Sequence, residues 1–513
     1  MEQAAVTKGH PKGLYLLFVT EMWERFSYYG MRAIFFLFMT NALFMSSADA
    51  SNVYGSYTGL VYLTPLLGGY ICDRYWGNRR SILVGGVLMA LGQLLLFYSG
   101  SLVTEGSQSA ASLNAMWAGL TLLIIGNGFF KPNISTMVGQ LYPANDRRID
   151  SAFTIFYMGI NLGALFSPLV AGGLGDTGNI FDFKWGFLAA SIGMVLGVLT
   201  FELLKNRYLV HDDGTPVGMP TGKMDWKTWL ILGVTALGIY ALMNFKSWFN
   251  SELDLVGYLI YGAMIAMPII IFSDKKLGKN EKQRISVIFI LAFFVIFFWA
   301  CFEQAGASLT HFADKQTERH IGTWEMPASY FQSVNPIFII ALAPLFSMLW
   351  AWLGKRHMEP SSPLKMAIGL ALLSIGYMVI AFAVKDADNT AKVSMWWLIT
   401  LYGLHTMGEL CLSPIGLSMV SKLAPIRLSS LLMGTWFLAN AAANKFAGTL
   451  SALIPPTGGE IAPGEMVKYP VFLGFQIDSL YNFFLIFIVL SGTAAVLLFA
   501  IHKWLKRLMH GVN

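Results

Sequence analysis

The sequence predicts an all-α integral membrane protein with fourteen spanning helices. Only 12% of its residues are charged and 55% are hydrophobic, whereas about 25% of the residues in soluble domains are charged. Apolar runs close to the roughly 20 residues that a spanning helix requires recur along the whole chain. Connections rich in Lys and Arg alternate with connections poor in them, as loops on opposite sides of a bilayer do. The net charge of +6 therefore reports membrane orientation, and no nucleic-acid partner is expected.

The apolar runs fall into groups of six, two and six. The first six cover residues 13–40, 51–72, 81–100, 112–141, 150–174 and 185–204. Two further runs, 228–245 and 255–273, lie between polar stretches and look inserted. The last six cover residues 285–310, 329–353, 365–384, 393–421, 428–453 and 478–502. This pattern predicts two pseudo-symmetric six-helix bundles around a cavity, in residues 1–205 and 284–513, and a linker of residues 206–283 that carries two additional helices.

Basic residues mark the connections that are predicted to face the cytoplasm. These residues are Arg74, Arg79, Arg80, Arg147, Arg148, the Lys and Arg residues of 275–284, Lys355 and Arg356. The positive-inside rule makes their loops cytoplasmic, and an even number of spans then places both termini there. The first apolar run carries charges and lacks a small-residue cleavage site after it, so no cleavable signal peptide is expected.

The first span, GLYLLFVTEMWERFSYYGMRAIFFLFMT, carries ionisable residues in its interior. At about 100° per residue, Glu21, Glu24, Arg25 and Arg32 share one face of a helix. A charge at mid-bilayer costs roughly 2.5–3.5 kcal/mol, so this face must meet protein, water or a permeant. A structural salt bridge from Glu21 or Glu24 to Arg25 is the simpler explanation. A proton relay or a substrate path is the functional one, and we favour it.

Two later spans of the first half are also polar inside. Lys131 lies within GNGFFKPN, residues 126–133, where packing alone does not explain an ammonium. It would hold a carboxylate, either of the protein or of a permeant. Tyr157 and Asn161 are four residues apart and share a face, which suits either a link between helices or a ligand contact.

Acids, amides and tryptophans mark the second half. Trp299 and Glu303 are four residues apart in one span, and Asn335 precedes a proline at the start of the next. Glu409 has no cation near it in the sequence, so its partner must come from another helix, a proton or a cationic permeant. Trp436 could line a site or simply pack. Four charged residues follow the first of these spans, and they are Asp314, Lys315, Glu318 and Arg319. We expect them to be solvated, although one of them could close an outer gate.

Neither a metal centre nor an enzyme active site is expected. Cys72, Cys301 and Cys411 lie singly in apolar segments, without the spacing of a disulfide framework or a zinc site. His405 and Glu409 are four residues apart, but two potential ligands without a further His or a paired Cys motif make a weak metal site.

Several motifs resemble known families. Residues 68–80, GGYICDRYWGNRR, resemble the cytoplasmic loop signature G-x-x-x-D-R-x-G-R-R of the major facilitator superfamily, with two extra residues, and could lock helices together by charge-assisted hydrogen bonds. Residues 21–29, EMWERFSYY, resemble the E-x-x-E-R-F-x-Y-Y signature of the proton-coupled oligopeptide transporter family. FYMGINLGAL, residues 156–165, is similar to that family's F-Y-x-x-I-N-x-G-S-L, with Ala164 in place of serine. The resemblance covers essentially the whole chain, and the inserted pair is similar to that of bacterial members.

The resemblance implies a major facilitator fold and the proton-coupled import of di- and tripeptides across a bacterial inner membrane. Arg32 and Lys131 would take the peptide carboxylate and Glu409 its amino group, while Glu303 would pair with Arg32 when no peptide is bound. The implied proton-coupling residues are Glu21, Glu24, Arg25, Lys131 and Glu303. The implied peptide-binding residues are Tyr29, Arg32, Tyr62, Lys131, Tyr157, Asn161, Trp299, Asn335, Glu409, Ser413 and Trp436. No cofactor is implied beyond the proton gradient, and we expect a monomer in the lipid bilayer.

The charges of the residues themselves agree with a zwitterionic cargo. The first half contributes Arg32 and Lys131, and the second half contributes Glu409. A peptide spans at most about 3.6 Å per residue, so fixed clamps at both ends favour very short peptides. Two alternatives stay open: transport of nitrate or another small anion, which the two cations would suit, and a substrate sensor that does not transport.

Overall fold

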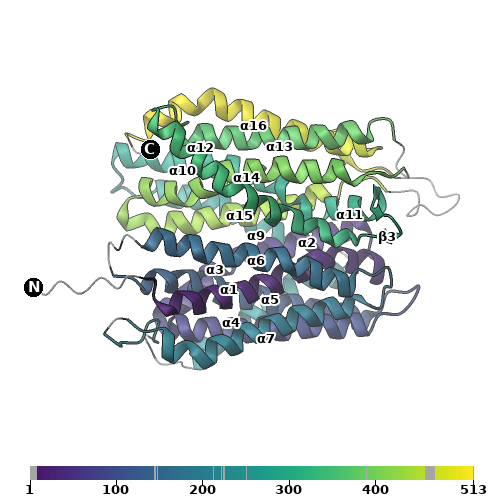
Figure 1. The fold of residues 1–513 in the computed structure, drawn as a ribbon, viewed down its shortest axis with the longest axis horizontal. Helices are drawn as coiled ribbons and strands as arrows, with labels where there is room; N and C mark the ends of the chain where they lie inside the picture. Colours follow the sequence, from purple (N-terminus) through teal and green to yellow (C-terminus); the bar gives the residue numbers. More distant parts are fainter. Residues whose placement is uncertain are drawn as a thin grey trace, which may run out of the picture. The chain divides into compact units, whose positions relative to one another are not determined.

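The computed structural model describes residues 9–511 apart from 144–145, 147, 212, 221, 223–225, 250, 388–390 and 457–467. Within the helices, the side chains of residues 413–418, 421, 426 and 430 are also outside the described part. Long helices dominate the described residues (Figure 1). Contacts divide the chain into two compact units, Met1–Ile34 with Thr64–Asn244 (unit 1) and Phe35–Leu63 with Phe245–Asn513 (unit 2). The predicted domain limits 1–205, 206–283 and 284–513 stay a prediction.

Unit 1 contains the helices of the first half of the chain except η1 and α2. They are α1 (Lys12–Leu37, up to Ile34), α3 (Pro65–Ile71), η2 (Cys72–Trp76), α4 (Gly77–Ser101), α5 (Ala110–Gln140), α6 (Ile149–Gly175), α7 (Phe183–Tyr208) and α8 (Trp226–Phe249, up to Asn244). Helix α4 packs against both α5 and α7, as Figure 1 shows. A Cβ on Gly85 would lie 2.6 Å from the carbonyl oxygen of Gly126. Glycine therefore allows the backbones of α4 and α5 to approach closely.

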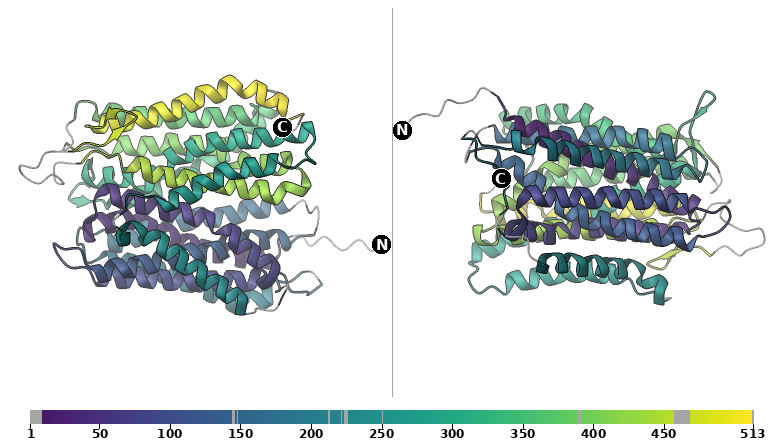
Figure 2. Two further views of the ribbon diagram at one scale, coloured as in Figure 1. Left: turned by 180° about the vertical axis from the view of Figure 1, so that it is seen from behind. Right: turned by 90° about the horizontal axis from the view of Figure 1, so that it is seen from below.

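Unit 2 begins with the end of α1 and contains the remaining helices. They are η1 (Phe38–Ala42), α2 (Ser47–Leu63), α9 (Leu255–Phe272), α10 (Lys279–Phe302), η3 (Glu303–Gly306), α11 (Ser308–Lys315), η4 (Ala328–Ser333), α12 (Val334–Lys355), α13 (Ser362–Val384), α14 (Met395–Leu423), η5 (Ile426–Leu428), α15 (Ser429–Ser451) and α16 (Leu480–Leu508). Helix α13 packs against α14 and α16, and α13 and α16 lie side by side in Figures 1 and 2. Helix α15 packs against α2, α9 and α10.

Three short strand pairs join helices of unit 2. Strand β1 (Thr317–Glu318) pairs in parallel with β4 (Val393–Ser394), while β2 (His320–Ile321) and β3 (Trp324–Glu325) form an antiparallel hairpin, as do β5 (Val471–Phe472) and β6 (Phe475–Gln476). Gly474 has φ +86° in the β5–β6 turn, a conformation that glycine adopts without strain.

Ten helical segments among the described residues are long and apolar enough to cross a membrane, which agrees with the predicted all-α membrane class. The count of fourteen spans stays a prediction. Several predicted spans are not continuous α-helices. The span 51–72 breaks between α2 and α3 at Pro65, which lacks a backbone donor, and the span 285–310 tightens into η3 at Glu303.

Candidate functional site

The buried face of α1 holds an acid–base cluster in unit 1. The Nε atom of Arg25 lies 2.8 Å from Glu21 Oε1 and 2.7 Å from Glu24 Oε2. None of the three side chains is more than 3% exposed. The salt bridge that the sequence suggested between Arg25 and Glu21 or Glu24 is present, with both acids. The two carboxylates share one guanidinium group in a buried position, where water does not screen their charges. A change in the charge of one group therefore changes the interaction energies of the other two.

Helix α5 supplies further polar groups beside Glu24. Asn127 Nδ2 donates to Glu24 Oε1 at 3.4 Å, and Lys131, one turn farther along α5, interacts electrostatically with the same carboxylate. Lys131 therefore has a protein carboxylate within reach, as its position in the sequence suggested. Two acids and two cations make the cluster close to neutral, and the addition of one proton would leave an excess positive charge.

Aromatic rings accompany the arginines of α1. The guanidinium carbon of Arg25 lies 5.7 Å from the ring centre of Tyr28, and that of Arg32 lies 5.8 Å from the ring centre of Tyr29. Arg32 is 8% exposed. Cation–π contacts of this kind stabilise desolvated guanidinium groups.

Tyr157 and Asn161 share a face of α6, as predicted. Asn161 Nδ2 donates to the carbonyl oxygen of Tyr157 at 2.9 Å, so this amide group bonds to its own helix. Tyr157 is 42% exposed. The pair stays a prediction as a cargo contact.

An acid, an amide and a hydroxyl come together in unit 2. Asn335 Nδ2, in the first turn of α12, donates to Glu409 Oε2 at 2.9 Å and to Thr406 Oγ1 at 3.0 Å. Glu409 is 8% exposed, and Glu303 at the start of η3 interacts electrostatically with it. The expected partner of Glu409 from another helix is thus the amide group of Asn335. The sequence analysis missed Thr406, although a threonine one turn from Glu409 could have suggested it.

The remaining predicted residues of unit 2 lie on several helices. Trp299 of α10 packs edge-to-face against Phe298 and Phe302, at centroid distances of 5.3 and 5.2 Å. Trp436 of α15 is 5% exposed, and Tyr62 near the end of α2 is half-buried. Ser413 belongs to α14, but its side chain is outside the described residues.

The expectation that the charges after η3 are solvated was wrong for Asp314 and Arg319. Their side chains are only 15% and 10% exposed, and they lie 3.6 Å apart. Lys315 Nζ lies 2.9 Å from Asp314 Oδ2, and Asn41 of η1 donates to that oxygen at 3.4 Å. Two ion pairs and a hydrogen bond from the amide group of Asn41 therefore surround Asp314.

Two buried polar residues of unit 2 were also missed. Gln304 of η3 donates to Ala300 O and Ala447 O at 2.9 and 3.1 Å, and its own oxygen accepts from Ser451 Oγ at 2.6 Å. Lys445 of α15 is 2% exposed and pairs with Asp254. A lone glutamine or lysine inside an apolar run was the available signal for both.

The loop of unit 1 that resembles the major facilitator signature is fastened by Arg79. This side chain donates to Val217 O at 2.6 Å, to Leu209 O at 2.5 Å and to Asn206 Oδ1 at 2.9 Å. The expected charge-assisted hydrogen bonds are present, and their acceptors lie at the end of α7 (Asn206) and in the segment that follows it (Leu209 and Val217). A Cβ on Gly77, which has φ +66°, would lie 2.3 Å from the carbonyl oxygen of Met219.

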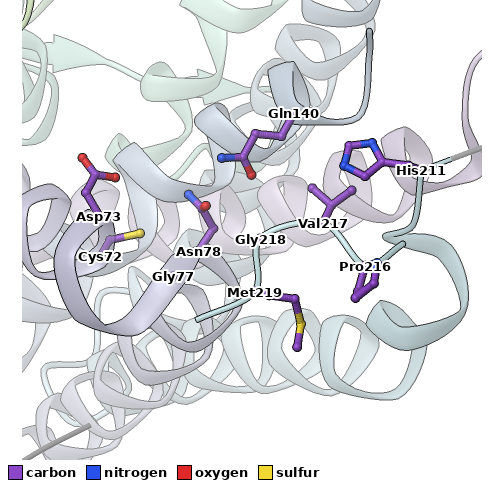
Figure 3. Close-up of a pocket in the computed structure, with 10 residues that line it drawn as sticks. All are labelled: Cys72, Asp73, Gly77, Asn78, Gln140, His211, Pro216, Val217, Gly218 and Met219. Atoms are coloured by element: carbon purple, nitrogen blue, oxygen red, sulfur yellow. The ribbon is translucent and has the colours of Figure 1, made fainter. Parts of the chain in front are cut away.

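A cavity of about 320 Å³ opens beside this loop (Figure 3). Asn78 and Gln140 project toward it, while Asp73 and His211 lie on opposite sides. The lining residues are Cys72, Asp73, Gly77, Asn78, Gln140, His211, Pro216, Val217, Gly218 and Met219. None of the predicted peptide-binding residues lines it. In the described part of the chain, no group of three His, Cys, Asp or Glu residues could hold a metal ion.

Known proteins are similar to this chain over most of its length. The profile of the POT family matches residues 79–459. An uncharacterised transporter of Bacillus subtilis (strain 168) is 37% identical over 88% of this chain and 90% of its own. A peptide transporter of Yersinia enterocolitica is 35% identical over 90% of each chain. A crystal structure of a peptide transporter in complex with alafosfalin has a TM-score of 0.81 at 33% identity, covering 99% of this chain and 97% of that one.

Proposed function

Because this chain belongs to the POT family, a family of membrane transporters and not of enzymes, we propose that it is a proton-coupled symporter of di- and tripeptides. It would import them across the inner membrane of a bacterium, with both termini in the cytoplasm, and act as a monomer. The relatives that are named peptide transporters support the choice of cargo.

The proposal of proton coupling depends on one observation, the sharing of Arg25 by Glu21 and Glu24 in the buried face of α1. A buried carboxylate that loses its charge no longer attracts the guanidinium. Protonation of Glu21 or Glu24 would therefore weaken one of the two contacts of Arg25 and free Lys131 from its attraction to Glu24. Loss of the proton to the cytoplasm would restore both interactions.

The cargo would be recognised by its two ends. In this proposal the peptide carboxylate binds Arg32 and Lys131, and the peptide ammonium binds Glu409. Lys131 then exchanges Glu24 for the cargo, which links the proton to the peptide. Glu303 would pair with Arg32 in the absence of cargo. Such coupling is reciprocal in free energy, because each ligand changes the affinity for the other by the same factor.

The other predicted residues would contact the rest of the peptide. Asn161 and Asn335 would bind its backbone, and Tyr29, Tyr62 and Tyr157 would form a polar wall. Trp299 and Trp436 would line the side-chain pockets, with Ser413 near the amino end. Because the charged residues would bind only the amino and carboxyl ends, which all peptides share, peptides with many different side chains would be accepted.

The proton gradient supplies enough energy for accumulation. One proton that moves inward across 100 mV releases about 2.3 kcal/mol, and each unit of pH difference adds about 1.4 kcal/mol. Together these allow accumulation of roughly 500-fold for one proton per neutral peptide.

Uptake of labelled dialanine into proteoliposomes tests the proposal. We expect accumulation with an inward proton gradient and only equilibration after an uncoupler is added. Uptake that does not depend on the proton gradient would refute proton symport. An absence of dialanine flux would favour a substrate sensor that does not transport. Uptake of labelled nitrate, with no uptake of dialanine, would favour the anion transporter. Glu409 favours a zwitterion over an anion, because a buried carboxylate repels a negative cargo.

A further inference from the structure

The hydrogen bonds around Asn335 fix the direction of its amide group. Both N–H bonds of Nδ2 are used on α14, one by Thr406 Oγ1 at 3.0 Å and one by Glu409 Oε2 at 2.9 Å. A flipped amide would place its carbonyl oxygen against the carboxylate of Glu409 and lose both bonds. The side chain of Asn335 is therefore held by two acceptors that are one turn apart on the same helix.

The hydroxyl group of Thr406 is itself oriented. Thr406 Oγ1 donates to the carbonyl oxygen of Tyr402 at 2.7 Å, and the side chain is fully buried. Because its proton is committed to this backbone carbonyl, a lone pair of the hydroxyl faces Asn335. The chain of bonds runs from Asn335 through Thr406 to Tyr402, and each bond polarises the next.

We infer that Thr406 is a positioning residue for recognition of the cargo's ammonium group. It acts through Asn335, which holds one oxygen of Glu409 and leaves the other oxygen for the cargo. The inference rests on the proposed function, in which Glu409 receives the amino group of the peptide. It assigns Asn335 a second task besides the proposed contact with the peptide backbone. Loss of the hydroxyl group would remove one of the two hydrogen bonds of Asn335, and the carboxylate of Glu409 would then adopt a wider range of orientations.

Thr406→Val removes the hydroxyl and nearly preserves the shape of the side chain. The test measures inhibition of trace labelled dialanine uptake by unlabelled dialanine and by N-acetyl-dialanine, which has no ammonium group. We expect the inhibition constant of dialanine to rise about threefold to tenfold, within the range for one lost hydrogen bond between neutral groups. The constant of N-acetyl-dialanine should change less than twofold, so the preference for a free amino end should fall.

Two variants control for packing. Thr406→Ser keeps the hydroxyl and should keep the wild-type preference. Thr435→Val is a matched control, because Thr435 is equally buried and makes the same bond to a carbonyl one turn back, at 2.9 Å to Leu431 O. It should also keep the preference. If Thr406→Val raises both constants equally, or changes neither, the inference is wrong.

Glu409→Gln separates failure of this inference from failure of the proposed function. If the wild type does not prefer dialanine, or if Glu409→Gln keeps the preference, Glu409 does not bind the ammonium and the proposed function fails together with the inference. If Glu409→Gln removes the preference while Thr406→Val retains it, only the role of Thr406 is refuted. If Thr406→Val reconstitutes poorly, the lower yield leaves the ratio of the two constants measurable, and Thr406→Ala provides a second variant without the hydroxyl.

Discussion

Lys445 of α15 lies 2.9 Å from Asp254, the residue that caps the first turn of α9. The same ammonium donates to Ser56 of α2 at 2.8 Å. One buried cation thus joins an inserted helix to two other helices of unit 2. Lys445 is 2% exposed, whereas the Asp254 side chain is 46% exposed. Water can therefore solvate the carboxylate of Asp254 when Lys445 is removed, but it cannot reach the ammonium of Lys445 when Asp254 is removed.

This difference predicts unequal effects of the two substitutions. Asp254→Asn should lower the free energy of unfolding by about 1–3 kcal/mol, because it leaves a buried ammonium without its carboxylate. Lys445→Met should cost less, since water can reach Asp254. The double variant should then recover part of the stability lost in Asp254→Asn. Thermal unfolding in detergent, followed by tryptophan fluorescence, measures all three.

The exposed ion pair of Lys246 and Glu252, at 3.4 Å, serves as the control for this comparison. Glu252→Gln should leave the unfolding temperature unchanged, because exposed pairs contribute little. Equal losses in Asp254→Asn and Lys445→Met would contradict the interpretation.

Substitutions in the cluster on α1 should abolish accumulation of dialanine against its gradient and leave its exchange across the membrane intact. Glu24→Gln imitates a permanently protonated acid, so the carrier should still exchange internal for external dialanine. Under an inward proton gradient, the final concentration ratio should fall from hundreds to about one. Glu21→Gln should behave in the same way if the two carboxylates act as a unit. Counterflow and gradient-driven uptake in the same vesicles check both statements.

Glu202→Gln is the matched control, because Glu202 lies on α7, is half exposed and pairs with Lys205. It should accumulate dialanine like the wild type. A Glu24→Gln protein that still concentrates the peptide would remove Glu24 from the coupling mechanism.

Arg79 predicts a local change in protease sensitivity. Arg79→Lys replaces a planar fork that reaches three oxygen atoms by a single ammonium. We expect trypsin to cut near Arg207 several times faster, because the segment after α7 loses its anchor. Arg80→Lys is the control, since Arg80 is exposed beside it. Equal cleavage in the two variants would show that the anchor lies elsewhere.

Asp146 predicts how the loop between α5 and α6 responds to pH. The Arg148 side chain, and then its backbone N–H, donate hydrogen bonds that lower the pKa of Asp146 to about 2, from an ordinary value of 3.8. A carboxyl group with a lowered pKa stabilises the folded loop above its unfolded pKa, and this contribution disappears as the pH falls through about 2. Between pH 7 and pH 5 it should be constant.

Hydrogen exchange of residues 141–155 tests this statement. Asp146→Asn should lose protection at pH 7 and at pH 5 by the same factor relative to the wild type at each pH. A difference between the two proteins that shrinks between pH 7 and pH 5 would mean that a group other than Asp146 controls the loop.

Local periodicity accounts for what the sequence predicted well. The pairing of Glu21 with Arg25 and the shared face of Tyr157 and Asn161 follow from spacing on one helix. The apolar runs also predicted the long helices, with ends displaced by a few residues. The span 13–40, for example, is α-helical to Leu37 and then widens into the π-helical turn η1.

Distant partners account for what the sequence could not predict. Asn335 and Glu409 are 74 residues apart, and Lys445 and Ser56 are 389 residues apart. Periodicity cannot show which helices become neighbours, so it identified Glu409 as polar but could not name the amide that binds it. The same limit applies to Asp314, whose burial depends on side chains that the helix pattern does not bring together.

The bond from Arg79 to the carbonyl oxygen of Leu209 closes a loop of 130 residues. A ribosome adds roughly 5–20 residues per second, so on the order of 7–26 s pass between synthesis of the arginine and synthesis of its acceptor. During that interval the nascent chain inserts several helices while this guanidinium still lacks its final acceptors. The fastening of Arg79 therefore cannot precede synthesis of the end of α7 and the segment after it, and a chain truncated before residue 206 would leave the ribosome without any of the three acceptors.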